Sequence, residues 1–143
     1  MIEASPLLPL DPADRELIAA AHAVLRRHYR PLWHTVGAAL RDRSGRIWTG
    51  VHLGATVGRL SVCAEAVAFG RCVLEGDGGV AVVVAVRHPK PDEIARDLAV
   101  VSPCGACREM FMDFDAEALV IVPGADGPGK LPIRSLLPQP YRR

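Results

Sequence analysis

The sequence predicts an α/β protein in which helices cover a sheet that opens with a hairpin. Helix-like and strand-like segments alternate along the chain, which is typical of this class. The run VAVVVAV at 80–86 has no polar alternation, which is typical of a strand covered on both faces. Two apolar runs flank Ser44-Gly45, which indicates an antiparallel hairpin. With 143 residues, no internal repeat and no linker, residues 1–143 are expected to form one domain.

The first half of the chain is predicted to hold two helices and the hairpin. Asp11 before Pro12 marks a helix start, and apolar residues spaced three and four apart continue the helix to Pro31. The hairpin follows over residues 34–53. After a glycine-containing loop, helical spacing returns over residues 61–74, and the glycines and acids of EGDGG end this second helix.

The second half is predicted to alternate strands and helices. Ligands of α/β sheets bind beyond the ends of the strands, so the segments that follow these strands are of most interest. The elements are the covered strand at 80–86, a polar connection, a short strand at 98–103, a helix from Cys104 to about Phe114, a strand at 118–122, a Gly/Pro-rich loop at 123–130 and a short helix at 132–137.

Composition excludes several classes of function. The formal net charge is +1, with 17 basic and 16 acidic residues, so we expect no nucleic-acid partner. The N-terminal sequence lacks a basic segment followed by a long apolar run, and no apolar run is long enough for a bilayer, so we expect no membrane partner and a cytoplasmic location. Four cysteines in such a chain are expected to be reduced thiols, available as metal ligands or nucleophiles.

Three of these cysteines lie at the starts of two predicted helices. Cys104 and Cys107 are three residues apart and share one helix face, and Cys63 would supply a third sulfur from the other helix. Helix N-termini lower thiol pKa values, and three protein ligands leave the fourth position of Zn²⁺ to a water molecule. Glu65 follows Cys63 closely enough to hydrogen-bond that water. The sequence therefore predicts a catalytic zinc site with Glu65 as general acid and base.

These motifs resemble those of the cytidine deaminase superfamily, in its small tetrameric branch that includes cytidine deaminases and blasticidin S deaminase. The hairpin VGAALRDRSGRIWTGV, then CAE, SPCGACRE and LLPQPY, follow the family's order. The resemblance implies a three-layer α/β/α cytidine deaminase-like fold with a mixed five-stranded sheet. It implies hydrolytic removal of the exocyclic amine from a pyrimidine nucleoside or nucleoside analogue. It also implies substrate contacts at Ala64 and Ser102, and a homotetramer in which Tyr141 closes a neighbour's site.

The chain departs from the cytidine branch around the substrate. In the cytidine branch, the loop after the hairpin carries an N-[VI]-E motif whose amide and carboxylate hold the ribose hydroxyls. At the matching positions this chain has His52, Leu53 and Gly54. His34 takes the place of an aromatic residue that stacks on the substrate in that branch. We therefore expect His34, His52 and Gly54 at the substrate. Because Gly54 stands where the motif has its glutamate, the carboxylate that would bind the ribose hydroxyls is missing. This favours an aminated substrate other than cytidine, such as blasticidin S. The loop at 52–60, however, is as long as the corresponding loop of the cytidine branch. Cytidine and blasticidin S therefore both remain candidate substrates.

Other interpretations fit parts of the pattern. CGAC alone also resembles a redox C-x-x-C, and a closed structural zinc would need a fourth ligand, for which His88 is the nearest candidate. Ala66 replaces a family arginine, so Arg108 and the helix N-termini are expected to offset the thiolate charge. The alternatives in function are a catalytically inactive zinc-stabilised binding protein, a deaminase of a non-nucleoside aminated heterocycle, and a nucleic-acid editing enzyme.

Overall fold

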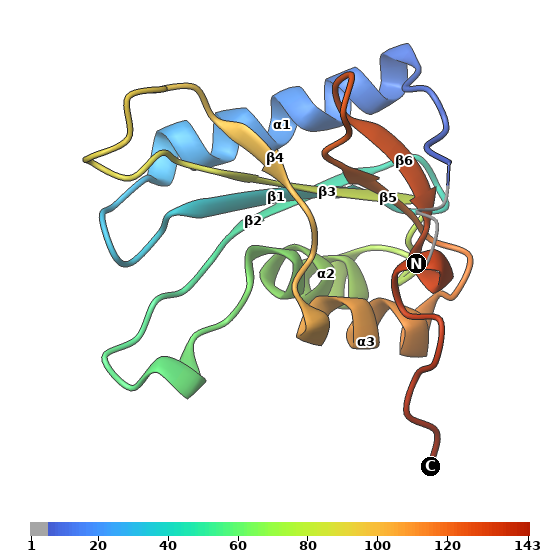
Figure 1. Cartoon of the computed structure of the whole chain (residues 1–143). Coiled ribbons are helices and arrows are strands. Elements are labelled where there is room, and N and C mark those ends of the chain that lie inside the picture. The colour runs from blue at the N-terminus through green and yellow to red at the C-terminus, as the bar shows by residue number, and fades with distance from the viewer. Residues whose placement is uncertain (1–5) are drawn as a thin grey trace.

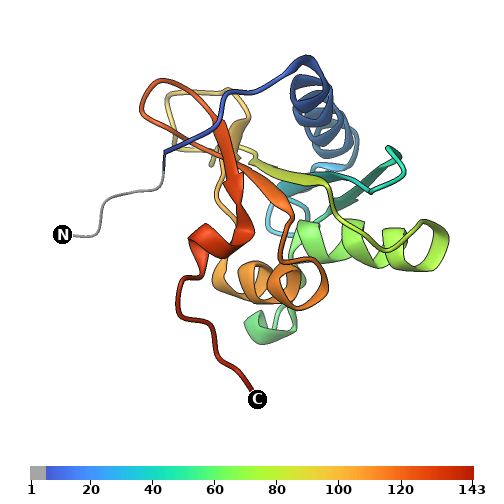
Figure 2. The same cartoon turned by 90° about the vertical axis from the view of Figure 1, so that its right-hand side faces the viewer.

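A computed structural model describes residues 6–143, which form a mixed sheet of six strands with helices on both faces (Figure 1). The strand order is β2-β1-β3-β5-β6, and β4 pairs with β3 beside this path. A side view shows the sheet between α1 and the pair of helices α2 and α3 (Figure 2). The predicted three-layer α/β/α class with a mixed sheet is therefore confirmed. The elements are α1 (Pro12–His28), β1 (Val36–Arg41), β2 (Ile47–Val51), η1 (Gly58–Leu60), α2 (Ala64–Glu75), β3 (Val82–Arg87), β4 (Ala99–Val101), α3 (Gly105–Phe114), β5 (Leu119–Val122), β6 (Gly129–Pro132) and η2 (Ile133–Leu136).

Side chains of the central strands alternate between two apolar cores. Val83 and Ala85 of β3 belong to the core on the side of α2 and α3, whereas Val84 and Val86 belong to the core on the side of α1. Successive side chains of a strand point to opposite faces, so a strand covered on both faces needs apolar residues throughout. This explains the run of valines in β3.

Capping interactions fix the start of α1. The Asp14 N–H donates to the Asp11 carboxylate at 2.8 Å, and the Asp11 N–H donates to the Asp14 carboxylate at 2.9 Å. These bonds satisfy two N–H groups that an isolated helix would leave unpaired. Lys130 of β6 also lies 2.6 Å from Asp14, which ties the helix start to the edge of the sheet.

The buried carboxylate of Asp42 organises the turn between β1 and β2. It accepts hydrogen bonds from the backbone N–H groups of Ser44 and Arg46, from the Ser44 hydroxyl at 2.6 Å and from the Trp48 indole N–H at 2.9 Å. Burial alone would raise the pKa of Asp42, but these hydrogen bonds lower it to about 2. Gly45 completes the turn with φ 95°, a conformation that glycine adopts without strain.

Gly50 lets the backbone of α2 lie directly on β2. A Cβ atom added at Gly50 would meet the Ala68 nitrogen at 2.6 Å and the Ala64 carbonyl oxygen at 2.8 Å. Only glycine avoids this collision, because it has no side chain. The strand thereby sets the distance between the sheet and α2, whose first turn carries Glu65.

The structure adds detail that the sequence patterns did not contain. A sixth strand, β6, occupies the stretch read as the end of a Gly/Pro loop, because residues 129–132 pair with β5. Helix α2 begins at Ala64, not at residue 61, because Val62 is extended and exchanges backbone hydrogen bonds with Leu53. In the described part of the chain, no helix has both the length and the apolar character that crossing a bilayer requires.

Candidate active site

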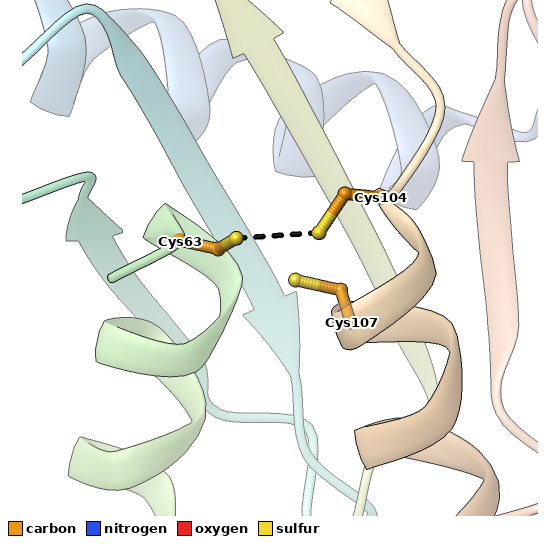
Figure 3. Close-up of side chains that lie close together, drawn as sticks. All are labelled: Cys63, Cys104 and Cys107. Atoms are coloured by element: carbon orange, nitrogen blue, oxygen red, sulfur yellow. Dashed lines mark hydrogen bonds between the residues drawn. The ribbon is translucent and has the colours of Figure 1, made fainter. Parts of the chain in front are cut away.

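Three sulfur atoms from two helix starts converge on one point between α2 and α3 (Figure 3). Cys63 and Cys104 are the N-cap residues of α2 and α3, and Cys107 lies in the first turn of α3. The Sγ atoms of Cys63 and Cys104 lie 3.3 Å apart, and all three Sγ atoms lie within 4.8 Å of one another. A tetrahedral Zn²⁺ with Zn–S bonds of about 2.3 Å requires sulfurs about 3.8 Å apart. The donor set therefore fits zinc in chemistry, and the three sulfurs lie close enough together for one ion to contact them all after a shift of about 0.5 Å between Cys63 and Cys104.

The acid–base properties of the thiols depend on burial and on the start of α3. Burial raises the pKa of Cys63 to about 11 and raises that of Cys107 further. Burial also acts to raise the pKa of Cys104, but the backbone N–H groups of Cys107 and Ala106, together with the neighbouring thiols, lower it. Three thiolates this close to one another repel, so a divalent cation is the natural partner of the set.

The guanidinium group of Arg108 points to backbone carbonyls instead of to the sulfurs. Its Nε donates to the Pro103 oxygen at 2.9 Å and its Nη1 donates to the Leu136 oxygen at 3.2 Å. These bonds join the residue before Cys104 to the short helix η2. Arg108 therefore holds the start of α3 in place, and the helix N-terminus supplies the positive end near the thiols.

Glu65 lies beside the sulfurs and is 5% exposed. Burial raises the pKa of its carboxyl, while its own backbone N–H and the Cys107 thiol oppose the rise. It is held in the first turn of α2, two residues after the N-cap Cys63. A buried carboxyl at this place can accept a proton from a bound water and pass it on.

Cys63, Glu65 and Cys104 line a pocket of about 240 Å³. This is smaller than the ~300–1,000 Å³ of sites for drug-sized ligands, so it suits a single ring more than a large molecule. Three residues predicted at the substrate, His52, Ala64 and Ser102, line it. The remaining lining residues are Thr35, Val36, Ser61, Val62 and Val101.

The sequence did not single out those last five residues. None of them carries an ionisable or metal-binding group, so no motif marked them. Their signal was positional, because Thr35 precedes a strand and Val101 ends one, while Ser61 and Val62 lead to the N-cap Cys63.

The structure places the other predicted substrate residues outside this pocket lining. His34 Nδ1 lies 2.8 Å from the carbonyl oxygen of His52. The Gly54 N–H donates to the Trp33 carbonyl at 2.8 Å, and an added Cβ would collide with the Leu32 carbonyl. Tyr141 is 82% exposed, in a C-terminal segment that extends away from the rest of the chain (Figure 1).

The geometry also bears on the alternatives for the cysteines. Among residues 6–143, the group of ligand atoms around the three sulfurs includes no fourth cysteine, histidine or carboxylate. His88 stacks on Tyr29 with ring centroids 3.5 Å apart, and its Nδ1 lies 2.8 Å from the Pro89 oxygen. Because Cys63 from a second helix is as close as 3.3 Å to Cys104, the arrangement favours a three-sulfur metal set over a two-cysteine redox pair.

Comparisons with known proteins agree with this geometry. The family model "Cytidine and deoxycytidylate deaminase zinc-binding region" matches residues 12–123. A blasticidin-S deaminase from Bacillus cereus is 41% identical over 130 residues, which cover 91% of this chain and 93% of that protein. A cytidine deaminase from Sporosarcina psychrophila is 33% identical over 101 residues, which cover 69% of this chain and 68% of that protein. The crystal structure of the cytidine deaminase from Mycobacterium leprae has a TM-score of 0.73 at 26% identity, and the match covers 90% of this chain and 100% of that one.

Proposed function

The chain belongs to the cytidine and deoxycytidylate deaminase family, whose model describes a zinc-binding region, and we propose that it removes the exocyclic amine of a pyrimidine nucleoside or nucleoside analogue by zinc-dependent hydrolysis. Membership of the family, together with the blasticidin-S deaminase relative, makes the chain a deaminase. The observation that carries the finer proposal is the cluster of three cysteine sulfurs beside one buried carboxylate, with Cys63, Cys104 and Glu65 lining a single ring-sized pocket.

Cys63, Cys104 and Cys107 would hold the metal ion. When bound, Zn²⁺ supplies a Lewis acid that lowers the pKa of a water molecule and so provides a nucleophile near neutral pH. Glu65 takes a proton from the attacking water and delivers it to the ring nitrogen next to the carbon under attack. It then passes the second proton to the departing amine, so that one water is consumed and one ammonia is released.

The wall of the pocket would orient the ring. Ala64 directly follows Cys63, Ser102 lies two residues before Cys104, and both line the pocket, so their main-chain groups can meet the polar edge of a pyrimidine. We include His52 in the substrate-binding set on the same ground.

The substrate we propose first is blasticidin S or a compound like it. The Bacillus cereus relative is named for that activity, and its match extends over 91% of this chain. Among the pocket-lining residues, Glu65 alone carries a carboxylate, and the proposed reaction uses it. A pocket of this kind has no carboxylate to spare for the hydroxyls of ribose, which disfavours plain cytidine.

We further propose one domain and a homotetrameric assembly in the cytoplasm. The two apolar cores lie on opposite faces of the same sheet, which supports a single domain. All four cysteines are free thiols, which supports a reducing compartment. The exposed Tyr141 on an extended C-terminal segment supports a role against a second subunit.

The experiment combines zinc analysis with a substrate panel. Purified protein is assayed for zinc per chain and for ammonia release from cytidine, deoxycytidine, cytosine and blasticidin S. Glu65→Ala is expected to keep about one zinc per chain and to lose activity by a factor of about 10² or more, because it removes the proton carrier alone. Glu75→Ala, at the exposed end of the same helix, is the matched control and should behave as the unsubstituted protein.

The panel separates the alternatives. Zinc bound without turnover of any substrate would support a zinc-stabilised binding protein. Turnover that survives Glu65→Ala would refute the role assigned to this residue. Turnover of cytosine without any nucleoside or analogue would indicate a deaminase of free heterocycles.

A further inference from the structure

One ring nitrogen of His52 is committed to the backbone. The Thr35 N–H donates to His52 Nδ1 at 2.8 Å, and a backbone N–H cannot act as an acceptor. Nδ1 must therefore be unprotonated, and the proton of the neutral ring resides on Nε2. Protonation of the ring would break this bond, so the contact itself favours the neutral form.

The other ring nitrogen of His52 is free to serve a ligand. Among residues 6–143, no group bonds Nε2, and no buried side-chain nitrogen in this part of the chain lacks a partner. Nε2 is thus accessible, on a residue that lines the pocket. Burial and the neighbouring His34 both lower the pKa of His52, which agrees with a neutral ring.

The backbone of His52 is held on two sides. Its N–H donates to the Val36 carbonyl at 2.9 Å, and its carbonyl oxygen lies 2.8 Å from His34 Nδ1, which donates when it carries the proton. His34 in turn belongs to a tight turn closed by its own backbone bonds to Arg30 at 2.8 and 3.1 Å. These contacts fix where the His52 ring enters the pocket.

There is room beyond the ring-sized pocket on this side. Thr35 and Val36 also line a second cavity of about 540 Å³, between the turn at 29–32 and the loop at 87–92. Thr35, which donates to His52 Nδ1, lines both cavities, so the imidazole lies in the first cavity on the side where the second adjoins it. A substrate with its ring in the first cavity can place a substituent against His52, which lines that cavity.

We propose that His52 is a specificity residue whose Nε2–H donates to an acceptor oxygen on the substituent of the pyrimidine, and that His34 is a positioning residue for it. This inference rests on the proposed deaminase function and narrows its substrate. A carboxylate accepts such a bond about twice as strongly as a neutral oxygen. The site is therefore built for a nucleoside analogue that carries a carboxylate or carbonyl beyond the ring.

Binding is measured in the Glu65→Ala background, where turnover does not interfere. The probes are blasticidin S, whose substituent carries a carboxylate and an amide, cytidine, whose substituent carries hydroxyls, and cytosine, which has none. His52→Phe keeps a ring without the donor and should raise the Kd of blasticidin S about tenfold, while that of cytosine changes little. His52→Gln keeps an N–H donor and should recover most of the affinity. His28→Phe, at the exposed end of α1, is the control for the substitution itself.

A spectroscopic readout tests the donor directly. The ¹⁵N resonances of His52 should report the Nε2–H tautomer in the free protein at neutral pH, and the Nε2 resonance should move on addition of blasticidin S but not of cytosine. An Nδ1–H tautomer, or equal weakening of all three ligands in His52→Phe, would overturn the proposal.

The His34 arm separates positioning from general stability. His34→Phe removes the bond to the His52 carbonyl and should raise the KM for blasticidin S several-fold with little change in kcat, whereas His34→Asn keeps a donor and should restore the KM. Equal losses in both variants, or a loss in kcat alone, would contradict the positioning role. If the zinc-loaded protein deaminates nothing, the proposed function fails, but the binding and tautomer measurements still decide the role of His52.

Discussion

Gly50 links packing to chemistry, and Gly50→Ala is the sharpest test of that link. The new Cβ would face the Ala68 nitrogen at 2.6 Å and the Ala64 oxygen at 2.8 Å, both of them backbone atoms that cannot turn aside. Ordinary contact begins near 3.4 Å, so α2 would have to retreat by several tenths of an ångström. That helix carries Glu65 and follows Cys63, so the retreat displaces one sulfur and the proposed proton carrier relative to α3.

Two magnitudes follow from this displacement. Overpacking of a close contact costs about 1–3 kcal/mol, so the free energy of unfolding should fall by that amount. A misplacement of ~1 Å in an active site can cost ~10² in rate, so a smaller shift should lower kcat/KM about three- to thirtyfold. Zinc affinity should fall as well, because Cys63 moves away from Cys104 and Cys107.

The assays are urea unfolding, zinc competition with a chromogenic chelator, and ammonia release. Gly70→Ala is the matched control: Gly70 lies in the same helix with nothing within 4 Å of an added Cβ, so the change should stabilise the helix by about 0.5–1 kcal/mol and leave turnover unchanged. Normal stability and activity of Gly50→Ala would refute the argument that β2 sets the position of α2.

Three further predictions concern the ligands and their supports. Cys63→Ser should reduce zinc to well below one per chain in elemental analysis, because one of three thiolates is lost, and full retention would exclude Cys63 as a ligand. Arg108→Lys should accelerate zinc release to a chelator about as much as Arg108→Gln does, because neither side chain can bond both carbonyls. If Arg108→Lys released zinc as slowly as the unsubstituted protein while Arg108→Gln did not, the charge of Arg108 and not its two hydrogen bonds would be what retains the metal. Asp42→Asn should lower the free energy of unfolding by about 1–3 kcal/mol at pH 7. The asparagine side chain has one acceptor oxygen, so the Trp48 indole N–H would face an amide N–H₂ donor and lose its hydrogen bond. Since the pKa of Asp42 is lowered from 3.8 to about 2, its stabilisation is complete above about pH 4 and disappears as the pH falls toward 2, so the difference from the unsubstituted protein in urea titrations should shrink over that interval and not at higher pH.

The proximity of the proposed zinc ligands to Glu65 was predictable from sequence because its signals are local. Cys63 and Glu65 are two residues apart, and Cys104 and Cys107 are three apart, so each half of the set is fixed by one helix start. That the two starts meet follows from a general property of α/β sheets, whose strand ends gather at one place. The covered strand β3 was predictable for a similar reason, since burial on both faces leaves a plain apolar run.

Other features depended on tertiary contacts that no local pattern carries. The strand β6 has a composition of Gly, Lys, Leu and Pro, and it is a strand because β5 and Leu8 pair with it. His34 and Gly54 were placed at the substrate by resemblance, and the structure shows each in contact with backbone: His34 near the His52 carbonyl and Gly54 against the turn at 30–34. Their position depends on how that turn folds back, which sequence spacing does not specify.

Cys63 and Cys104 are separated by 41 positions, and this has a consequence for how the protein matures in the cell. A nascent chain that has emerged from the ribosome only through α2 offers Cys63 alone of the three proposed zinc ligands, and a single ligand can retain an ion only weakly. The full set exists only after the segment that includes Cys107 has emerged and docked. On the proposed function, zinc loading would therefore be a late event of biogenesis, and cells starved of zinc would be expected to accumulate a folded or nearly folded apoprotein, not nascent chains that already carry the ion.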